Sequence, residues 1–157
     1  MRLWRIAGDT RTYRADDLSG GGAAKFPGRW NADGERVLYC AQTISLTLLE
    51  TAAHIDDAGL PLNKYLVAVE IPDAPWAART VLDLTHLGPT WDAIPAGQES
   101  IRHGSSWYQS KRSLVLCVPS VIVPEEFAVI VNADHPEAAS LTARIERQID
   151  YNRLFRR

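Results

Sequence analysis

The stretch from Leu18 to His54, LSGGGAAKFPGRWNADGERVLYCAQTISLTLLETAAH, holds the loop, the strand and the helix around which the rest of the chain is organised. A glycine-rich segment, Gly20–Gly22, leads into KFPGRW at residues 25–30. The β-branched and aromatic residues of 36–41 predict a strand. The apolar run that follows predicts a helix from about Ile44 to Asp57.

Arg29 follows a proline and a glycine, and these two residues shape the loop that presents it. Pro27 fixes φ, whereas Gly28 permits conformations that are closed to other residues. Such a loop lets the backbone pass close to a ligand while the guanidinium of Arg29 offers a planar fork of donors. That fork suits a phosphate or a carboxylate better than a lysine does. The alternative is a surface turn with a solvated arginine.

Glu50 is the one carboxylate between Ile44 and His54 of the predicted helix, whose expected N-cap is Thr43. Helical spacing predicts that the buried face consists of four residues: Leu48, Leu49, Ala52 and Ile55. Glu50 then lies on the flank of that face. A carboxylate bordered by apolar groups is partly desolvated, which is how enzymes hold such a group ready for chemistry. The alternative is a solvated glutamate at the helix edge.

The rest of the chain reads as short strands with few helices between them. The predicted strands are Leu3–Ile6, Tyr65–Ile71, Val81–Leu84, Ser113–Val118 and Phe127–Val131. The Pro- and Gly-rich segment 85–104 is expected to be a loop with a possible short helix. Residues 140–150 fit either a helix or a strand, with a strand and an irregular tail preferred. This order of elements favours an α+β fold over a doubly wound sheet.

Composition sets the broad class. The 157 residues predict a single domain, residues 1–157, and a net charge of −2 disfavours direct nucleic-acid binding. Five tryptophans are expected to pack the core or line a pocket for a flat ligand. Cys40 and Cys117 lie in apolar runs and are expected to be buried, reduced thiols. No signal peptide, membrane-spanning run or metal-ligand spacing is recognisable, so a cytoplasmic protein without a metal is expected.

Several familiar catalytic motifs are missing. Ser120 follows a strand and a proline, but no G-x-S-x-G elbow surrounds it, which argues against a serine hydrolase. A serine that caps a turn is the simplest alternative. The Gly20–Gly22 segment is followed neither by the Gly-Lys-Ser/Thr of a phosphate-binding loop nor directly by a helix that a dinucleotide fingerprint requires.

Four motifs in order carry a resemblance: GGAAKFPGRWN, VLYCA, LLETAAH and VPSVIVP, followed by Asn132-Ala133-Asp134-His135-Pro136. Together they resemble the RES-domain toxins of RES–Xre toxin–antitoxin modules over nearly the whole chain. The arginine, glutamate and serine for which that family is named fall on Arg29, Glu50 and Ser120. The resemblance also implies a structural role for His135 and places 104–107 just before a helix.

The resemblance implies an ADP-ribosyltransferase-like α+β core, in which two small packed sheets and flanking helices surround a cleft for NAD⁺. The implied activity is cleavage of the nicotinamide–ribose bond by water or phosphate, which depletes NAD⁺. The alternative is mono-ADP-ribosylation of a specific protein. Arg29, Glu50 and Tyr39 are the expected catalytic residues. Substrate binding is expected from three others: Ser120, Lys25 and Trp30.

The resemblance further implies a partner, an Xre-type antitoxin with a helix-turn-helix domain that plugs the cleft. The expected assembly is a hetero-oligomer containing toxin dimers, and any DNA binding is expected to belong to the complex. A third possibility is a non-enzymatic module that kept the fold. The presence of all four residues of the motif set, Arg29, Tyr39, Glu50 and Ser120, argues against it.

Overall fold

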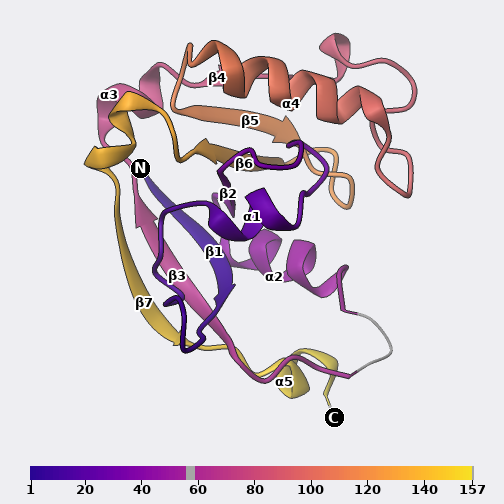
Figure 1. Cartoon of the computed structure of the whole chain (residues 1–157). Coiled ribbons are helices and arrows are strands. Elements are labelled where there is room, and N and C mark those ends of the chain that lie inside the picture. Colours follow the sequence, from indigo (N-terminus) through magenta and orange to yellow (C-terminus); the bar gives the residue numbers. More distant parts are fainter. Residues whose placement is uncertain (56–58, 157) are drawn as a thin grey trace.

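A computed structural model describes residues 1–55 and 59–156 (Figure 1). The strands are β1 Arg2–Gly8, β2 Val37–Ala41, β3 Lys64–Glu70, β4 Thr80–Val81, β5 Val115–Pro119, β6 Phe127–Asn132 and β7 Thr142–Gln148. The helices are α1 Gly21–Lys25, α2 Ile44–Ala52, α3 Asp73–Ala77, α4 Gln98–Ser110 and α5 Tyr151–Phe155, with 3-10 turns at η1 Leu84–His86 and η2 Pro136–Ser140. The predicted α+β class is confirmed.

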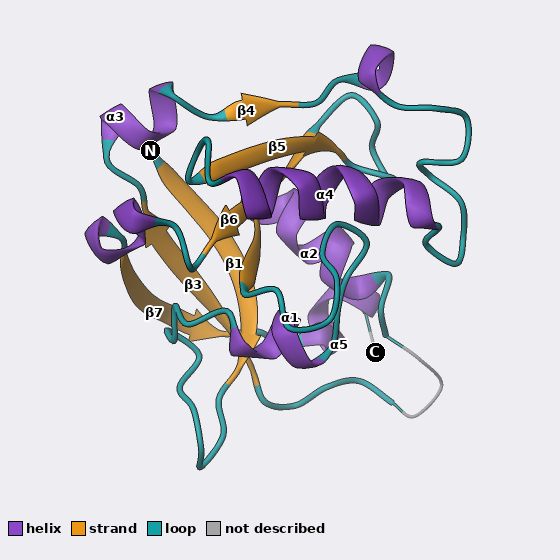
Figure 2. Ribbon diagram, turned by 45° about the horizontal axis from the view of Figure 1, so that its top comes forward, coloured by secondary structure: helices purple, strands orange, loops and turns teal. Residues whose placement is uncertain are grey.

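The strands form one seven-stranded sheet in the order β4-β5-β6-β2-β1-β3-β7. Every pairing is antiparallel except that of β4 with β5. Between β2 and β1 the ladder rests on a single pair, Trp4 with Ala41. The two small sheets that the resemblance implied are therefore two halves of one hydrogen-bonded sheet, which changes direction at this weak junction (Figures 1 and 2).

The main core lies between these two halves. Leu3 and Val69 from one half pack in the same cluster as Cys117 and Val129 from the other. The outer face of the β5–β6–β2 half carries a second cluster, which contains the tryptophans Trp30, Trp91 and Trp107. Every residue of β5 is buried, because one face meets the main core and the other meets the tryptophan cluster. The strand predicted at Ser113–Val118 is confirmed there, and Cys40 and Cys117 are buried free thiols as expected.

Helix α2 begins where the sequence predicted, with the side chain of Thr43 accepting a hydrogen bond from Leu46 N. It ends at Ala52 rather than at Asp57, a position outside the described residues. The predicted buried face was right only in part. Leu48 and Ile55 are half-buried against an apolar cluster, whereas Leu49 is 44% exposed, and the fully buried residues of the helix are Leu46 and Thr47. Apolar residues occur on more than one side of this helix, so periodicity could not select the face. Thr47 Oγ1 donates to Trp4 O, and that contact holds the Thr47 side against β1.

Helix α4 was predicted as a loop with a possible short helix, yet it runs for 13 residues along the β5 side of the sheet (Figure 2). Gly104 and Trp107 lie inside it rather than before it. A Cβ on Gly104 would lie 1.8 Å from the carbonyl oxygen of Trp30, so only glycine allows this approach. The Pro- and Gly-rich composition of 85–104 concealed the helix, because its start has no side-chain cap.

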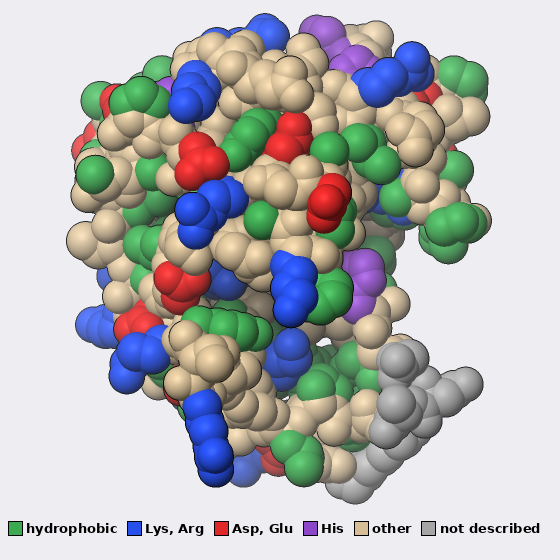
Figure 3. Space-filling view, viewed as in Figure 1, with side chains coloured by type: hydrophobic (Ala, Val, Ile, Leu, Met, Phe, Trp, Pro, Cys, Tyr) green, Lys and Arg blue, Asp and Glu red, His purple; other side chains and the backbone are tan. Residues whose placement is uncertain are grey.

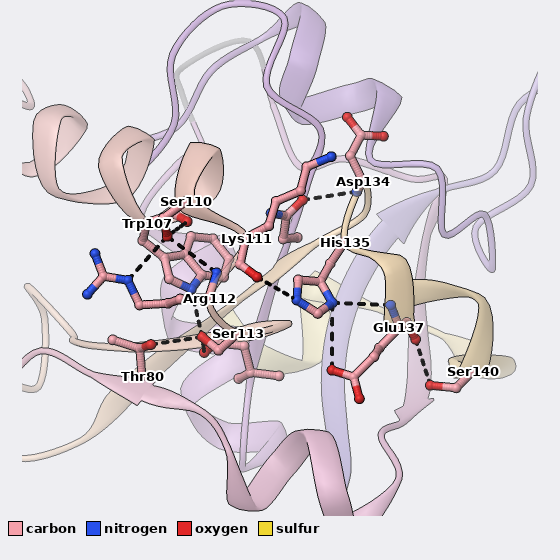
Figure 4. A network of polar contacts seen from close by, with 12 residues as sticks. Thr80, Trp107, Ser110, Lys111, Arg112, Ser113, Asp134, His135, Glu137 and Ser140 are labelled. Carbon is pink, nitrogen blue, oxygen red and sulfur yellow. Dashed lines mark hydrogen bonds and ion pairs between the residues drawn. The ribbon is translucent and has the colours of Figure 1, made fainter.

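A polar network fixes the end of α4 (Figure 4). Trp107 Nε1 donates to Ser113 Oγ at 2.9 Å, which ties the helix to the start of β5. Beyond the helix Lys111 adopts the left-handed conformation, with φ of 48°. His135 Nε2 lies 3.0 Å from Lys111 O, and His135 Nδ1 accepts a hydrogen bond from Glu137 N. His135 therefore has the structural role that was expected.

The ambiguous C-terminal segment is resolved by pairing. Residues Thr142–Gln148 form β7, which pairs with β3, so the strand interpretation was right. The tail was expected to be irregular, but Tyr151–Phe155 forms the short helix α5. Tyr151 is buried in a third cluster with Leu66 and Ile149, and this packing orders the tail.

Candidate active site

The carboxylate of Glu50 is held by Ser120, which comes from the far end of the chain. Ser120 Oγ donates to Glu50 Oε1 at 2.6 Å. Ser120 Oγ also accepts from Ile122 N at 3.1 Å and from Val123 N at 3.0 Å. Ser120 directly follows β5 and is 1% exposed. Its single proton and its acceptor capacity are thus committed to protein partners.

Glu50 itself is half-buried on α2 and retains an oxygen for chemistry. Within the described part of the chain, Glu50 Oε2 makes no hydrogen bond, and no cation forms an ion pair with the carboxylate. A carboxylate that is fixed through one oxygen and open at the other can accept from a ligand hydroxyl or face a developing positive charge.

The guanidinium of Arg29 is half-buried and bridges to the loop that precedes α4. Arg29 Nη1 donates to Trp91 O and to Ala93 O, both at 2.9 Å. Nε and Nη2 have no hydrogen-bond partner among the residues that the structure describes. The side chain is therefore anchored along one edge, while its other donors remain available to an anion.

Tyr39 lies on β2 with its ring half-buried and its hydroxyl engaged. The hydroxyl donates to Asn31 Oδ1 at 2.8 Å and accepts from Trp30 N at 2.9 Å. Burial raises the pKa of this phenol well above its usual value. Tyr39 is therefore neutral at physiological pH. Sequence reasoning missed Asn31, which is fully buried, because an asparagine in a turn-rich stretch resembles an ordinary turn residue.

The strand register relates the positions of Tyr39 and Ser120. Tyr39 is opposite Ile130, which is opposite Leu116 on β5. Ser120 lies four residues beyond Leu116 along the chain. Because side chains at even spacing in a strand point to the same face of the sheet, Ser120 is on the side of Leu116. Tyr39, Ala128 and Val121 all pack at the margin of the tryptophan cluster. Tyr39 and Ser120 therefore lie on the same side of the strand pattern, and Glu50 is joined to that side through its contact with Ser120.

The other two predicted substrate contacts differ in their exposure. Lys25 is exposed at the end of α1, with Nζ 5.5 Å from the centroid of the Phe26 ring. Trp30 is only 3% exposed, and its ring belongs to the tryptophan cluster. The ring of Trp30 therefore packs the core, and its backbone N–H is what reaches Tyr39.

Exposed apolar side chains flank each part of the site. Phe26, which is 73% exposed, precedes Arg29, and Ile94, which is 85% exposed, follows the carbonyls that hold Arg29. Leu49 and Ile122 are exposed beside Glu50 and Ser120. Figure 3 shows the surface hollowed on the right, between the loop that precedes α4 and the end of α2.

Other features of the described residues point elsewhere. A concave pocket of about 260 Å³ is lined by residues 60–62 and 148–152, none of which belongs to the candidate site. Across 1–55 and 59–156 no cluster of three or more His, Cys, Asp or Glu side chains is arranged to hold a metal ion. None of the described helices has the length and apolar character needed to cross a bilayer.

Comparison with known proteins assigns a family. The model of the RES domain matches residues 2–153. The "Prs ADP-ribosylating toxin" of Sphingobium sp. (strain YBL2) is 49% identical over 156 residues, covering 99% of this chain and 97% of the relative. A protein named "Toxin Res" from Pseudomonas putida (strain KT2440) is 33% identical, covering 99% of this chain and all of the relative.

A solved structure supports the fold. The toxin–antitoxin complex MbcT–MbcA of M. tuberculosis contains a chain that superposes with a TM-score of 0.62 at 20% identity. The match covers 95% of this chain and 82% of that one.

Proposed function

Because the chain belongs to the RES-domain family of toxins, we propose that it is a toxin enzyme that cleaves the nicotinamide–ribose bond of NAD⁺. The observation that carries this proposal is the Glu50 carboxylate, fixed through Oε1 by Ser120 and open at Oε2. This carboxylate is one fixed negative group, and Arg29 supplies guanidinium donors that protein groups leave open. No metal is required for the chemistry.

The reaction makes limited demands on the protein. Scission of the N-glycosidic bond passes through an oxocarbenium-like state, and the bonding electron pair leaves with nicotinamide. Nicotinamide departs as a neutral molecule, so no general acid is needed. Glu50 would accept from a ribose hydroxyl and stabilise the positive charge that develops at C1′. The acceptor then bonds to C1′ and releases its proton to solvent.

The remaining residues have matching roles. Arg29 would bind a phosphate of the dinucleotide through Nε and Nη2, which its contacts with Trp91 and Ala93 leave open. Ser120 would orient Glu50 rather than bind substrate directly, since its hydroxyl proton is already donated. The ring of Tyr39 would stack against the nicotinamide end. Lys25 would assist with phosphate charge from the exposed end of α1.

The acceptor distinguishes two candidate functions. Water or phosphate would make the protein an NAD⁺ glycohydrolase or phosphorylase, and turnover would deplete NAD⁺. The second candidate is transfer of ADP-ribose to a protein. It is favoured by the printed name of the relative at 49% identity, an ADP-ribosylating toxin.

We also propose an antitoxin as the physiological partner, an Xre-type protein with a helix-turn-helix domain. The structural relative is itself part of a toxin–antitoxin complex. With a net charge of −2 this chain has little electrostatic attraction for DNA, so operator binding should come from the partner. Toxin dimers within a cytoplasmic hetero-oligomer complete the proposal.

One experiment tests the function and the acceptor together. Purified protein is incubated with NAD⁺ labelled in the adenosine part, with and without phosphate, and with and without a cell lysate. Mass spectrometry identifies free ADP-ribose, its phosphate ester or an ADP-ribosylated protein. Release of nicotinamide in any arm supports the proposal. Folded protein that leaves NAD⁺ intact in every arm contradicts it.

A further inference from the structure

Asn31 is at the centre of the loop that presents Arg29, and it is fully buried. Its Oδ1 accepts from Gly28 N at 2.9 Å and from the Tyr39 hydroxyl at 2.8 Å. Its Nδ2 donates to three carbonyls, Ala23 O at 2.9 Å, Ala32 O at 3.1 Å and Glu35 O at 3.2 Å. Gly28 N can only donate and the three carbonyls can only accept, so the orientation of the amide is unambiguous.

The backbone N–H groups of the two residues that flank Arg29 are held by this arrangement. Gly28 N is bound by Asn31, and Trp30 N is bound by the Tyr39 hydroxyl, which in turn donates to Asn31. A Cβ on Gly28 would lie 2.6 Å from the Tyr39 hydroxyl oxygen, so the loop fits this hydroxyl closely. The backbone on each side of Arg29 is therefore set by one pair of side chains, Asn31 and Tyr39.

Helix α4 also supports the loop that presents Arg29. Glu35 is 7% exposed, and its Oε2 accepts from Ala32 N and from Ser105 Oγ, both at 2.8 Å. Gly104 brings the helix into contact with the backbone of Trp30. With the loop braced in this way, a change at Asn31 is not absorbed freely by its surroundings. We expect such a change to shift the backbone on either side of Arg29.

We propose that Asn31 is a positioning residue for Arg29. Asn31 and the Tyr39 hydroxyl together hold the Gly28 and Trp30 N–H groups, an arrangement that we call the clamp, while only the Tyr39 ring meets substrate. This inference rests on the proposed NAD⁺ site and assigns a division of labour within it. An aromatic ring in a cleft for NAD⁺ could act through its hydroxyl or through its face. Here the hydroxyl donates a hydrogen bond to Asn31 Oδ1 and accepts one from Trp30 N, whereas the residue as a whole is only partly buried.

The test uses Tyr39→Phe, Asn31→Ser and the double variant in the full-length protein. The matched controls are Tyr13→Phe and Asn152→Ser, both at exposed positions away from the loop. The first readout is hydrogen exchange of the Gly28 and Trp30 amides, followed by NMR. Tyr39→Phe should speed exchange at Trp30, and Asn31→Ser at both amides, by about tenfold or more for each lost hydrogen bond. Unchanged exchange at these amides overturns the clamp.

The second readout is NAD⁺ consumption, analysed as a double-mutant cycle. If both residues act through one clamp, each single variant should lower kcat/KM by about 5–30-fold, mainly through KM, and the double variant should be no worse than Asn31→Ser. Losses that multiply would show that the Tyr39 hydroxyl acts on substrate independently, and so would overturn the proposal. Normal kinetics in Asn31→Ser would also overturn it.

Two further outcomes remain separable. If Asn31→Ser fails to fold, Tyr39→Phe decides alone. It keeps the ring, so a loss in KM together with faster Trp30 exchange supports the clamp, and a loss confined to kcat contradicts it. If the wild-type protein consumes no NAD⁺ in any acceptor arm, the proposed function fails. In that case the exchange measurements still determine whether the clamp exists.

Discussion

Ser120 donates a hydrogen bond of 2.6 Å to Glu50 Oε1, joining two side chains that are 70 positions apart in the chain. Two backbone N–H groups hold the serine oxygen in turn. The carboxylate is therefore fixed to the end of β5 as well as to its own helix.

Glu50→Gln should separate charge from shape. The amide keeps the size of the side chain and an oxygen for Ser120, but removes the negative charge that faces the oxocarbenium. Turnover should fall by about 10²–10³-fold with little change in NAD⁺ affinity, because the lost interaction exists mainly in the transition state. Steady-state kinetics and NAD⁺ titration check this, with the exposed Glu125→Gln as control. A folded Glu50→Gln protein of near-normal turnover would remove Glu50 from the mechanism.

Ser120→Ala should damage both position and stability. It frees the Glu50 carboxylate and leaves the N–H groups of Ile122 and Val123 without their acceptor. The free energy of unfolding should fall by about 1–3 kcal/mol, and kcat by about tenfold, as expected for lost hydrogen bonds at a buried position. Urea denaturation and kinetics measure the two effects, and the exposed Ser45→Ala on α2 should show neither. Wild-type kcat in Ser120→Ala would contradict the positioning role.

Arg29→Lys should act on binding. An ammonium cannot contact both loop carbonyls and also present a planar fork to a phosphate. The KM for NAD⁺ should rise about tenfold or more, the cost of at least one charge-assisted hydrogen bond. The loop around Ile94 should also become more sensitive to limited proteolysis. Arg102→Lys, at an exposed position on α4, is the control, and equal KM values for the two variants would argue against phosphate binding by Arg29.

Gly104→Ala tests the approach of α4 to the Arg29 loop. The added methyl group would lie 1.8 Å from Trp30 O, so helix and loop must separate. We expect a loss of about 1–3 kcal/mol or more in unfolding free energy, as for overpacking. Gly22→Ala in α1 is the matched control, since its Cβ would meet nothing within 4 Å, and it should be neutral or stabilising by up to about 1 kcal/mol. Equal stability of the two variants would show that the contact is not tight.

Alkaline pH should weaken the fold through a buried thiol. Burial raises the pKa of Cys40 to about 11, above its value in the unfolded chain. The folded state therefore retains the proton longer, and stability that is complete below the unfolded pKa is lost as pH rises toward the folded pKa. The slope contributed is at most about 1.4 kcal/mol per pH unit. Urea denaturation at pH values between the unfolded and the folded pKa of Cys40 should show a shallower decline of the unfolding free energy for Cys40→Ala than for the wild-type protein. Equal declines in the two proteins would contradict the raised pKa of Cys40.

The sequence by itself determined the elements whose signal is local. Alternation and β-branching located β2, β3, β5 and β6, and the side chain of Thr43 capped α2 as its type predicts. The order of motifs gave the family and the α+β class. These features depend on neighbours within a few residues, where propensity and periodicity act. Where the local signal was weak, as for the uncapped α4 in a Pro- and Gly-rich segment, the prediction failed.

Only the tertiary structure decided how the site is built. Glu50 meets Ser120 because the register of β5, β6 and β2 and the direction of α2 bring their ends together. The same packing buries Trp30, engages the Tyr39 hydroxyl and gives Asn31 five contacts. Residue types show which groups can donate and accept. The partners that each group finds are fixed by long-range packing, because most buried polar atoms find a hydrogen-bond partner among the groups that packing brings near them.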